Sequence, residues 1–183
     1  MSEVDHRDQA AVALVTLRKR VDDHFDAALD RSPEQMQCRR GCAHCCHHRF
    51  GVFEVEAHRV RAALVRLGRR DPELRQRVRV QADDPATTDH CALLVDDRCT
   101  VYEDRPLICR THGLPTIVRD DDGSAKVAGC PLNFTSAKPP NASLLELAAV
   151  NAPLSVMARM WDGEGTRVDL ADLARAVDVL DEA

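Results

Sequence analysis

The eight cysteines of this chain constrain its fold more than any other feature, because all of them lie between residues 38 and 130. Four form a C-x3-C-x2-C-C run and four follow singly, at Cys38, Cys42, Cys45, Cys46, Cys91, Cys99, Cys109 and Cys130. The segments on both sides contain no cysteine and have helical patterns. One local chemical task therefore uses every thiol, either disulfide formation or metal ligation.

The N-terminus and the hydropathy of the chain favour reduced thiols. The first nine residues, MSEVDHRDQ, are charged and lack the apolar core of a secretory signal. The longest uncharged run, residues 147–158, has twelve residues, against the roughly 18 needed to span a bilayer. We therefore expect a soluble, cytoplasmic protein with no membrane partner, in which dense cysteines bind metal rather than form disulfides.

Length and composition fit a single domain with a core of its own. A chain of 183 residues predicts one domain over residues 1–183, with a metal-binding region at 38–133 flanked by helices. Aromatic residues make up only 3%, so the core must consist of Leu, Val and Ala. The net charge of −5 gives no reason to expect a nucleic-acid partner. Residues 38–49 contain three arginines and no carboxylate, which makes the setting of the first cysteines locally positive.

Apolar side chains that recur at three- and four-residue steps predict helices before the later cysteines. The third of these helices has a clear start, because Asp71 suits an N-cap and Pro72 suits the first helical position. The second is expected to end at Gly68. The three predicted ranges are 8–30, 54–67 and 71–84.

Two further helices are predicted after the cysteines. The segment from Ser143 to Glu146 matches a capping box, in which the serine and the glutamate satisfy the first backbone N–H groups of a helix. Pro153 is expected to break or kink that helix. Residues 169–180 predict the last helix.

Between the helical blocks, residues 91–102 contain two short apolar runs around an Asp-Asp-Arg sequence. This pattern predicts a β-hairpin that brings Cys91 and Cys99 together. Residues 103–113 predict a short helical turn, and an irregular loop is expected from there to Cys130. The predicted fold is therefore mainly α, a small helical domain with an irregular cysteine-rich middle and one short β-hairpin.

The spacing of the first cysteines suits metal ligation. Thiolates two or three residues apart can wrap one ion, at about 2.3 Å for zinc, and Cys38, Cys42 and Cys45 satisfy that spacing. Cys46 differs, because neighbouring Cα atoms lie about 3.8 Å apart and their side chains are expected to diverge. It serves a second centre, bridges two metals or acts in redox chemistry. All eight cysteines are candidate ligands, for two four-thiolate sites or for one polynuclear centre with spare thiols.

Positive side chains interleave with the cysteines. Four thiolates around zinc or an iron–sulfur cluster leave a net negative charge, which nearby arginines offset while lowering the thiol pKa. Arg105 and Arg110 are the candidate cofactor-binding residues, since they lie on either side of Cys109. Three other arginines are equally well explained as solvated surface: Arg39, Arg40 and Arg49. Five histidines beside cysteines are candidate ligands, donors to sulfur or exposed loop residues: His44, His47, His48, His90 and His112.

Three segments of the chain resemble one known family. They are CRRGCAHCC at residues 38–46, CALLVDDRCTVYEDRPLICRTHG at 91–113 and GCPLN around Cys130. Together they are similar to the CxxCxxCC cysteine-cluster family, the YkgJ-like zinc- or iron-chelating domain, over residues 38–133. The resemblance implies metal binding through these cysteines. The first interval holds three residues rather than two, a departure from the family pattern that affects the ligand set.

The same interval opens an enzyme hypothesis. Radical S-adenosylmethionine enzymes hold a [4Fe–4S] cluster with the spacing C-x3-C-x2-C, although their usual barrel of strands and helices is not expected here. Flagellin lysine N-methylases contain a similar cysteine cluster, which offers an analogy for methyl transfer. A structural zinc nodule that supports an interaction surface is a third hypothesis. The favoured one is a metal-binding protein with an iron–sulfur cluster, such as [4Fe–4S], or zinc as cofactor, in a redox, sensing or metal-handling role.

Overall fold

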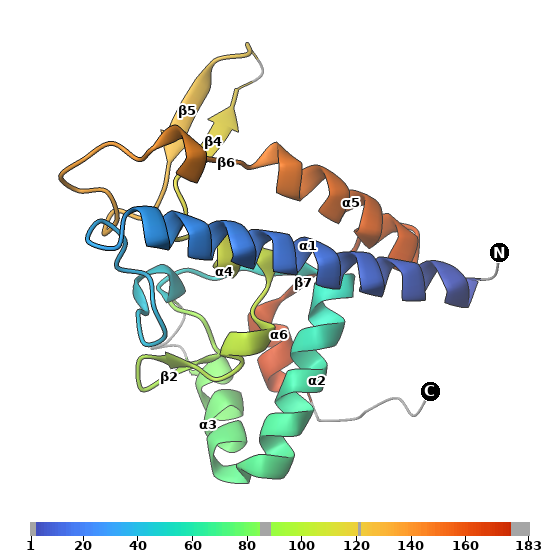
Figure 1. Cartoon of the computed structure of the whole chain (residues 1–183). Coiled ribbons are helices and arrows are strands. Elements are labelled where there is room, and N and C mark those ends of the chain that lie inside the picture. The colour runs from blue at the N-terminus through green and yellow to red at the C-terminus, as the bar shows by residue number, and fades with distance from the viewer. Residues whose placement is uncertain (1–2, 85–88, 121, 177–183) are drawn as a thin grey trace. The chain divides into compact units, whose positions relative to one another are not determined.

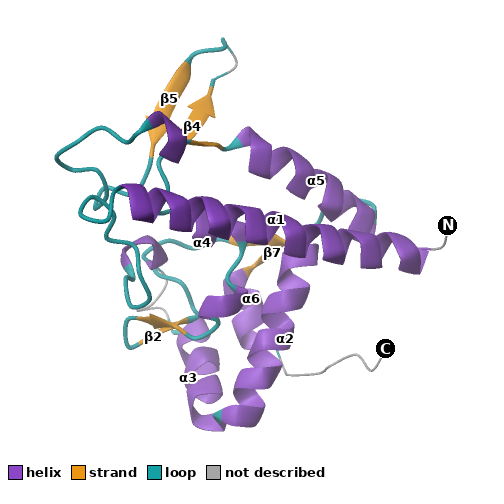
Figure 2. Cartoon of the chain, viewed as in Figure 1, coloured by secondary structure: helices purple, strands orange, loops and turns teal. Residues whose placement is uncertain are grey.

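The computed structural model describes residues 3–84, 89–120 and 122–176 and is mainly helical (Figures 1 and 2). The α-helices are α1 (Glu3–Arg31), α2 (Glu54–Arg70), α3 (Pro72–Asp83), α4 (Leu107–Thr111), α5 (Ala148–Asp162) and α6 (Leu170–Arg175). The 3₁₀ turns include η1 (His44–Cys46), η3 (Tyr102–Asp104) and η4 (Asn141–Ser143). The strands are β1 (Gly51–Phe53), β2 (Leu94–Val95), β3 (Arg98–Cys99), β4 (Thr116–Arg119), β5 (Ala125–Ala128), β6 (Leu145–Glu146) and β7 (Arg167–Asp169). The predicted fold class is confirmed.

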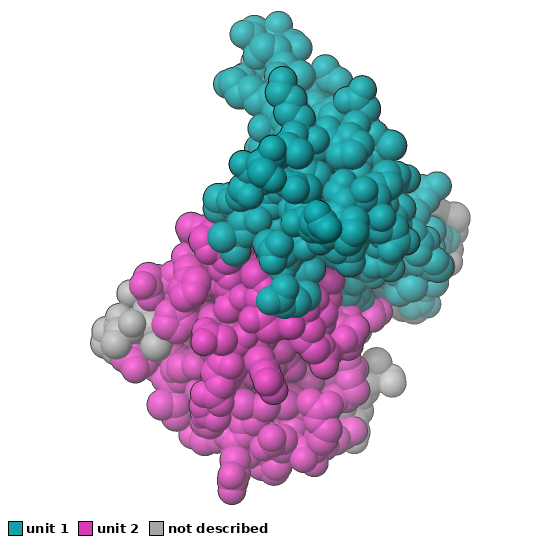
Figure 3. Space-filling view, turned by 60° about the vertical axis from the view of Figure 1, so that its left-hand side comes forward, with its two compact units in different colours: residues 1–39, 107–163 teal, residues 40–106, 164–183 magenta. Residues whose placement is uncertain are grey.

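The chain divides into two compact units, which Figure 3 shows in different colours. Unit 1 consists of residues 1–39 and 107–163, and unit 2 consists of residues 40–106 and 164–183. The cysteines divide with them. Unit 1 contains Cys38, Cys109 and Cys130, and unit 2 contains Cys42, Cys45, Cys46, Cys91 and Cys99.

Unit 1 is built on the long helix α1. One face of this helix is buried along its length, because small and aliphatic side chains recur at helical spacing: Ala10, Leu14, Leu17, Val21 and Ala28. Helices α4 and α5 pack against it (Figure 1). The unit also contains a three-stranded sheet, in which β4 pairs antiparallel with β5 and parallel with β6.

Unit 2 has an apolar core formed by α2, α3, α6 and the segment that carries β2 and β3. Its largest fully buried side chains are leucines and valines, as the low aromatic content predicts: Leu64, Leu67, Leu93, Leu170, Leu173, Val52, Val55, Val60 and Val78. Strands β1 and β7 form a separate antiparallel pair. Arg75 of α3 is 2% exposed and donates to the carbonyls of Ala174 and Ala176, both at 2.7 Å. This guanidinium satisfies carbonyl groups at the C-terminal end of α6 that have no partner within the helix.

The predicted hairpin is present. Leu94 pairs with Cys99 and Val95 with Arg98 in an antiparallel register. Asp96 and Asp97, which form the two-residue turn, have positive φ values of 50° and 56°. Aspartate tolerates this left-handed conformation, and two successive positive φ values match the twist of the flanking strands. The start of α3 is also as predicted, since the Asp71 side chain accepts the Leu74 N–H.

Several predicted boundaries are wrong. Helix α2 does not end at Gly68 but continues to Arg70. The capping-box segment is not a helix start, because Ser143 belongs to η4 and Glu146 to β6, where the glutamate forms an ion pair with Arg119 at 3.0 Å. Pairing of β6 with β4 satisfies the backbone there.

The later helices also differ from their predictions. Helix α5 begins at Ala148 and continues past Pro153 to Asp162, so the proline does not end it. Pro153 is the sixth residue of α5, past its first turn, so it removes the N–H that would bond to the Ala149 carbonyl without ending the helix. Helix α6 ends at Arg175, and residues 177–180 of the predicted last helix lie outside the described residues. The irregular loop expected before Cys130 instead contains the β4–β5 hairpin.

No helix among the described residues combines the length and the apolar character that crossing a bilayer requires.

Candidate metal centre

Four cysteines of unit 2 are linked by pairwise interactions, in which Cys46 contacts Cys45, and form what we call the thiol cluster: Cys45, Cys46, Cys91 and Cys99. The Cys45 thiol interacts electrostatically with those of Cys91 and Cys99, and the latter two interact with each other. The backbone joins the two contributing segments, because the Cys91 N–H donates to the Cys46 carbonyl at 2.7 Å. Residues that are 45 apart in sequence are thus held side by side.

The cysteine doublet does not behave as predicted from backbone geometry. The side chains of Cys45 and Cys46 were expected to diverge, but they form a hydrogen bond with each other. Both residues lie in η1, a tight turn closed by the bond from the Cys46 N–H to the Ala43 carbonyl at 2.8 Å. The turn and the short cysteine side chain allow adjacent sulfurs to meet. The two thiols can therefore act on the same local site.

Cys91 and Cys99 are placed by the hairpin. Cys91 is buried and Cys99 half-buried, with Cys99 opposite Leu94 in the strand register. The Cys91 sulfur accepts a hydrogen bond from the Leu93 backbone, and the Cys99 sulfur accepts one from the Val101 backbone. In both cases the donor is two residues further along the chain. Backbone donors aimed at sulfur stabilise the thiolate form, which is the form that binds metal.

Burial opposes ionisation of these thiols in the metal-free protein. It raises the pKa of Cys91 to about 12 and also raises that of Cys99. The hydrogen bond to Cys46 is the main cause of the raised pKa of Cys45, and burial adds to it. At neutral pH the thiols of Cys45, Cys91 and Cys99 therefore carry protons in the metal-free protein. A metal ion must displace them, so binding releases protons and strengthens as the pH rises.

Two arginines on the ring of Tyr102 place positive charge beside the cluster. The Arg105 guanidinium lies 4.0 Å from the ring centroid and donates to the Tyr102 carbonyl at 2.9 Å. The Arg40 guanidinium lies 5.0 Å from the same centroid and forms an ion pair with Glu103 at 2.5 Å. Both guanidiniums lower the pKa of Cys99, against the larger effect of burial. Arg105 also lowers that of Cys45.

In unit 1, Cys38 lies against Gly113. A methyl group at Gly113 would overlap the Cys38 sulfur and come within 3.0 Å of its Cβ and 3.1 Å of the Phe25 ring, so only glycine fits. The buried Asn133 amide donates to the Gly113 carbonyl at 2.7 Å and to the Cys38 sulfur at 3.4 Å. Its oxygen accepts the Gln37 N–H at 2.7 Å. Asn133 therefore ties the Cys38 segment to the turn after α4.

Asn133 is a residue that the sequence analysis did not select. It ends the GCPLN segment, and its own N–H donates to the Cys130 carbonyl at 3.0 Å. The only sequence signal for it was its position three residues after a cysteine. Its contacts with Cys38 and Gly113 depend on the tertiary fold.

The other predicted site residues differ in their surroundings. Arg110 is 6% exposed and donates to Asp22 of α1 at 2.7 Å, which fixes α4 on α1. The His47 and His90 rings meet edge to face at 6.2 Å between centroids, and His90 pairs with Asp89 at 3.0 Å. His47 is exposed, as are four other predicted residues: Arg39, Arg49, His44 and His48. Cys42 and His112 are half-buried, in unit 2 and unit 1 respectively.

The donor set of the thiol cluster fits zinc or iron, because both prefer soft thiolate ligands. All eight cysteines carry thiols rather than disulfides. Over residues 3–84, 89–120 and 122–176, no three His, Cys, Asp or Glu side chains are placed closely enough to hold an ion as they stand. To share one ion, the sulfurs of the cluster would have to move closer together.

Comparison with known families shows to which family the chain belongs. Residues 37–131, just over half of the chain, match the model of the CxxCxxCC family, described as "Putative zinc- or iron-chelating domain". The chain belongs to the CxxCxxCC family. The resemblance found in the sequence is thereby confirmed, and metal chelation is the general activity that membership supports.

All eight cysteines lie inside the part that matches the CxxCxxCC family, and Asn133 lies just beyond it. Neither the curated proteins nor the solved structures contain a match to this CxxCxxCC chain. The sheets of the described residues have two or three strands each, so no barrel of the radical S-adenosylmethionine type is present there.

Proposed function

We propose that unit 2 of this protein holds zinc or an iron centre through the thiol cluster, in a metal-handling, sensing or redox role. One observation carries the proposal: the hairpin brings the thiols of Cys91 and Cys99 together, and each accepts a backbone N–H two residues on. Buried neutral thiols have no need of such donors. Thiolate ligands do, because the donors spread their negative charge.

The residues around the cluster suit a negatively charged centre. Four thiolates and one divalent ion carry a net charge of about −2. Arg105 and Arg40 are both held against the ring of Tyr102 and act electrostatically on Cys99. Their charge offsets that of the thiolates, which is the role predicted for Arg105. When bound, zinc supplies a redox-inert ion, whereas an iron–sulfur cluster supplies one-electron chemistry.

The remaining cysteines are proposed as additional ligands. Cys42 is a candidate in unit 2, because it lies three residues before Cys45 and in the same unit. Cys38, Cys109 and Cys130 form a second candidate group in unit 1, to which Arg110 belongs by its position after Cys109. We favour iron–sulfur over zinc because of the high thiolate count, and a reducing compartment such as the cytoplasm because so many thiols are present.

Metal analysis after anaerobic purification tests the proposal. An iron–sulfur centre predicts a brown protein with iron and sulfide, and a zinc centre predicts a colourless protein with stoichiometric zinc. Cys91→Ser and Cys99→Ser should each lose at least half of the metal of unit 2, with the helical circular dichroism retained.

Cys130→Ser is the comparator, because it changes a buried cysteine in the other unit. It should leave the metal of unit 2 in place. If Cys130→Ser also loses metal, its loss should add to that of Cys91→Ser in the double variant. Non-additive losses would contradict a centre confined to unit 2. Full metal content in both Cys91→Ser and Cys99→Ser would refute the thiol cluster as the site.

A further inference from the structure

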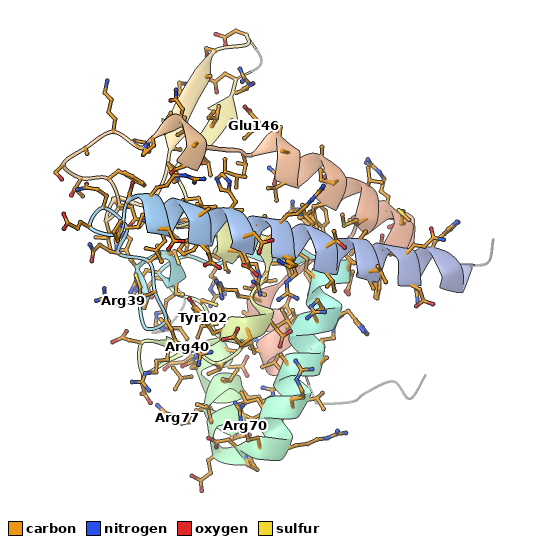
Figure 4. The ribbon with its side chains drawn as sticks, in the orientation of Figure 1. Arg39, Arg40, Arg70, Arg77, Tyr102 and Glu146 are labelled. Atoms are coloured by element: carbon orange, nitrogen blue, oxygen red, sulfur yellow. The ribbon has the colours of Figure 1, made fainter. Side chains whose placement is uncertain are left out.

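A groove of about 810 Å³ lies in unit 2, between α2, α3 and the segment from Val95 to Asp104. Its lining contains five arginines, from four different parts of the unit: Arg40, Arg66, Arg70, Arg77 and Arg98. Figure 4 labels three of them, Arg40, Arg70 and Arg77, together with Tyr102, around α2, α3 and the β2 hairpin. The groove also contacts Cys99, a member of the thiol cluster.

The carboxylates of the groove are mostly engaged. Glu103 pairs with Arg40 at 2.5 Å and Asp96 pairs with Arg77 at 2.6 Å. Asp104 is 16% exposed and holds two guanidiniums, at 2.6 Å and 3.1 Å. Asp71 caps α3, and Glu73 is the other acid of the lining. Most carboxylates that line the groove are therefore already paired with other groups of the protein.

Guanidinium groups remain available for a ligand. In the part of the chain that the structure describes, Arg70 and Arg98 form no ion pair with a carboxylate. Both partners of the Arg40–Glu103 pair are exposed, with side-chain exposures of 66% and 78%. The same holds for the Arg77–Asp96 pair, with side-chain exposures of 54% and 71%. Exposed pairs of this kind contribute little to stability, so a ligand can take over their guanidiniums.

We propose that this groove binds a small multivalent anion, bearing phosphate or carboxylate groups, beside the thiol cluster. Several guanidiniums that converge from separate elements recognise such groups through paired, charge-assisted hydrogen bonds. A single anionic group would occupy only one or two of them. A ligand with two or more anionic groups can engage guanidiniums from more than one of these elements, such as Arg70 on α2 and Arg98 on the hairpin. Its presence would place an anion next to Cys99.

Calorimetric titration with inorganic pyrophosphate and with citrate tests the proposal. The protein is used as purified, at constant ionic strength, with the metal content measured before and after so that chelation is not mistaken for binding. At least one of the two anions should bind with a 1:1 stoichiometry, and acetate at the same concentration should not. Binding of pyrophosphate alone assigns a phosphate ligand, and binding of citrate alone assigns a carboxylate ligand.

Arg70→Gln and Arg98→Gln should each weaken binding about tenfold, with unchanged circular dichroism. The matched control is Arg69→Gln, which removes an exposed arginine from the neighbouring position of α2 that does not line the groove. This control should change the affinity less than twofold. The proposal is overturned if neither anion binds, or if Arg69→Gln weakens binding as much as Arg70→Gln. None of these results depends on which metal the thiol cluster holds.

Discussion

The raised pKa of Cys91 predicts how the metal-free protein responds to alkaline pH. Burial raises this pKa from 9.0 to about 12. A thiol whose pKa is higher in the folded than in the unfolded state stabilises the fold fully below pH 9. That contribution is lost as the pH rises toward 12, because the unfolded chain releases the proton first. Metal-free protein should therefore become less stable above pH 9, while acidification should not remove the contribution of Cys91 to stability.

The magnitude follows from the two pKa values. Between pH 8 and pH 10, the difference in proton binding amounts to about 1.3 kcal/mol of unfolding free energy for this one thiol. Urea denaturation of metal-free, reduced protein at pH 8, 9 and 10 measures it. Cys91→Ala should remove about this much of the pH dependence.

Val95→Ala is the matched control, since it shortens another buried side chain of the same core without removing a titratable group. It should lower stability at every pH and keep the pH dependence of the original protein. The reasoning about burial of Cys91 is refuted if Cys91→Ala and the original protein lose the same free energy between pH 8 and pH 10.

Three further predictions concern the fold around the candidate centre. Gly113→Ala should destabilise the protein by about 1–3 kcal/mol in urea denaturation, because the added methyl group overlaps Cys38. Gly51→Ala is the control and should cost less than about 1 kcal/mol, because the nearest atom to its added methyl group is 3.7 Å away. Arg75→Met should cost about 1–3 kcal/mol, since it removes the donor to the buried Ala174 carbonyl of α6 and one of the donors to the Ala176 carbonyl. Arg77→Met, which breaks an exposed pair, should cost less than about 1 kcal/mol, and similar values for both variants would contradict the structure. Removal of metal by a chelator should lower the melting temperature but keep the helical circular dichroism, because unit 2 has its own apolar core; complete unfolding would instead support a purely structural zinc nodule.

The sequence predicts the parts of this fold that depend on local chemistry. The Asp-Asp turn of the hairpin and the Asp71-Pro72 start of α3 need no tertiary information, since the residue types themselves favour those conformations. The β4–β5 hairpin was missed because all four residues of β5 are exposed, so no alternation of apolar and polar side chains marks the strand. The capping box failed because pairing with β4 competes for the same backbone groups.

The candidate site also has features that the local sequence predicts and features that depend on the tertiary fold. The spacing of the cysteines predicts that they serve a metal, and family membership supports chelation. The hairpin pattern predicted that Cys91 and Cys99 lie together. Their grouping with the cysteine doublet could not be predicted, because the Cys91–Cys46 backbone bond and the contact of the Cys45 and Cys46 thiols depend on η1 and on the packing of the hairpin. Asn133 contacts a cysteine 95 residues away, which no local pattern reports.

X-ray absorption at the zinc and iron edges of the anaerobically purified protein tests the central claim most directly. The thiol cluster predicts a metal shell made of sulfur, at about 2.3 Å for zinc. Cys91→Ser and Cys99→Ser should each reduce the number of sulfur neighbours or abolish the signal. A first shell of nitrogen and oxygen, or a protein without stoichiometric metal, would contradict the claim that these thiols form the centre.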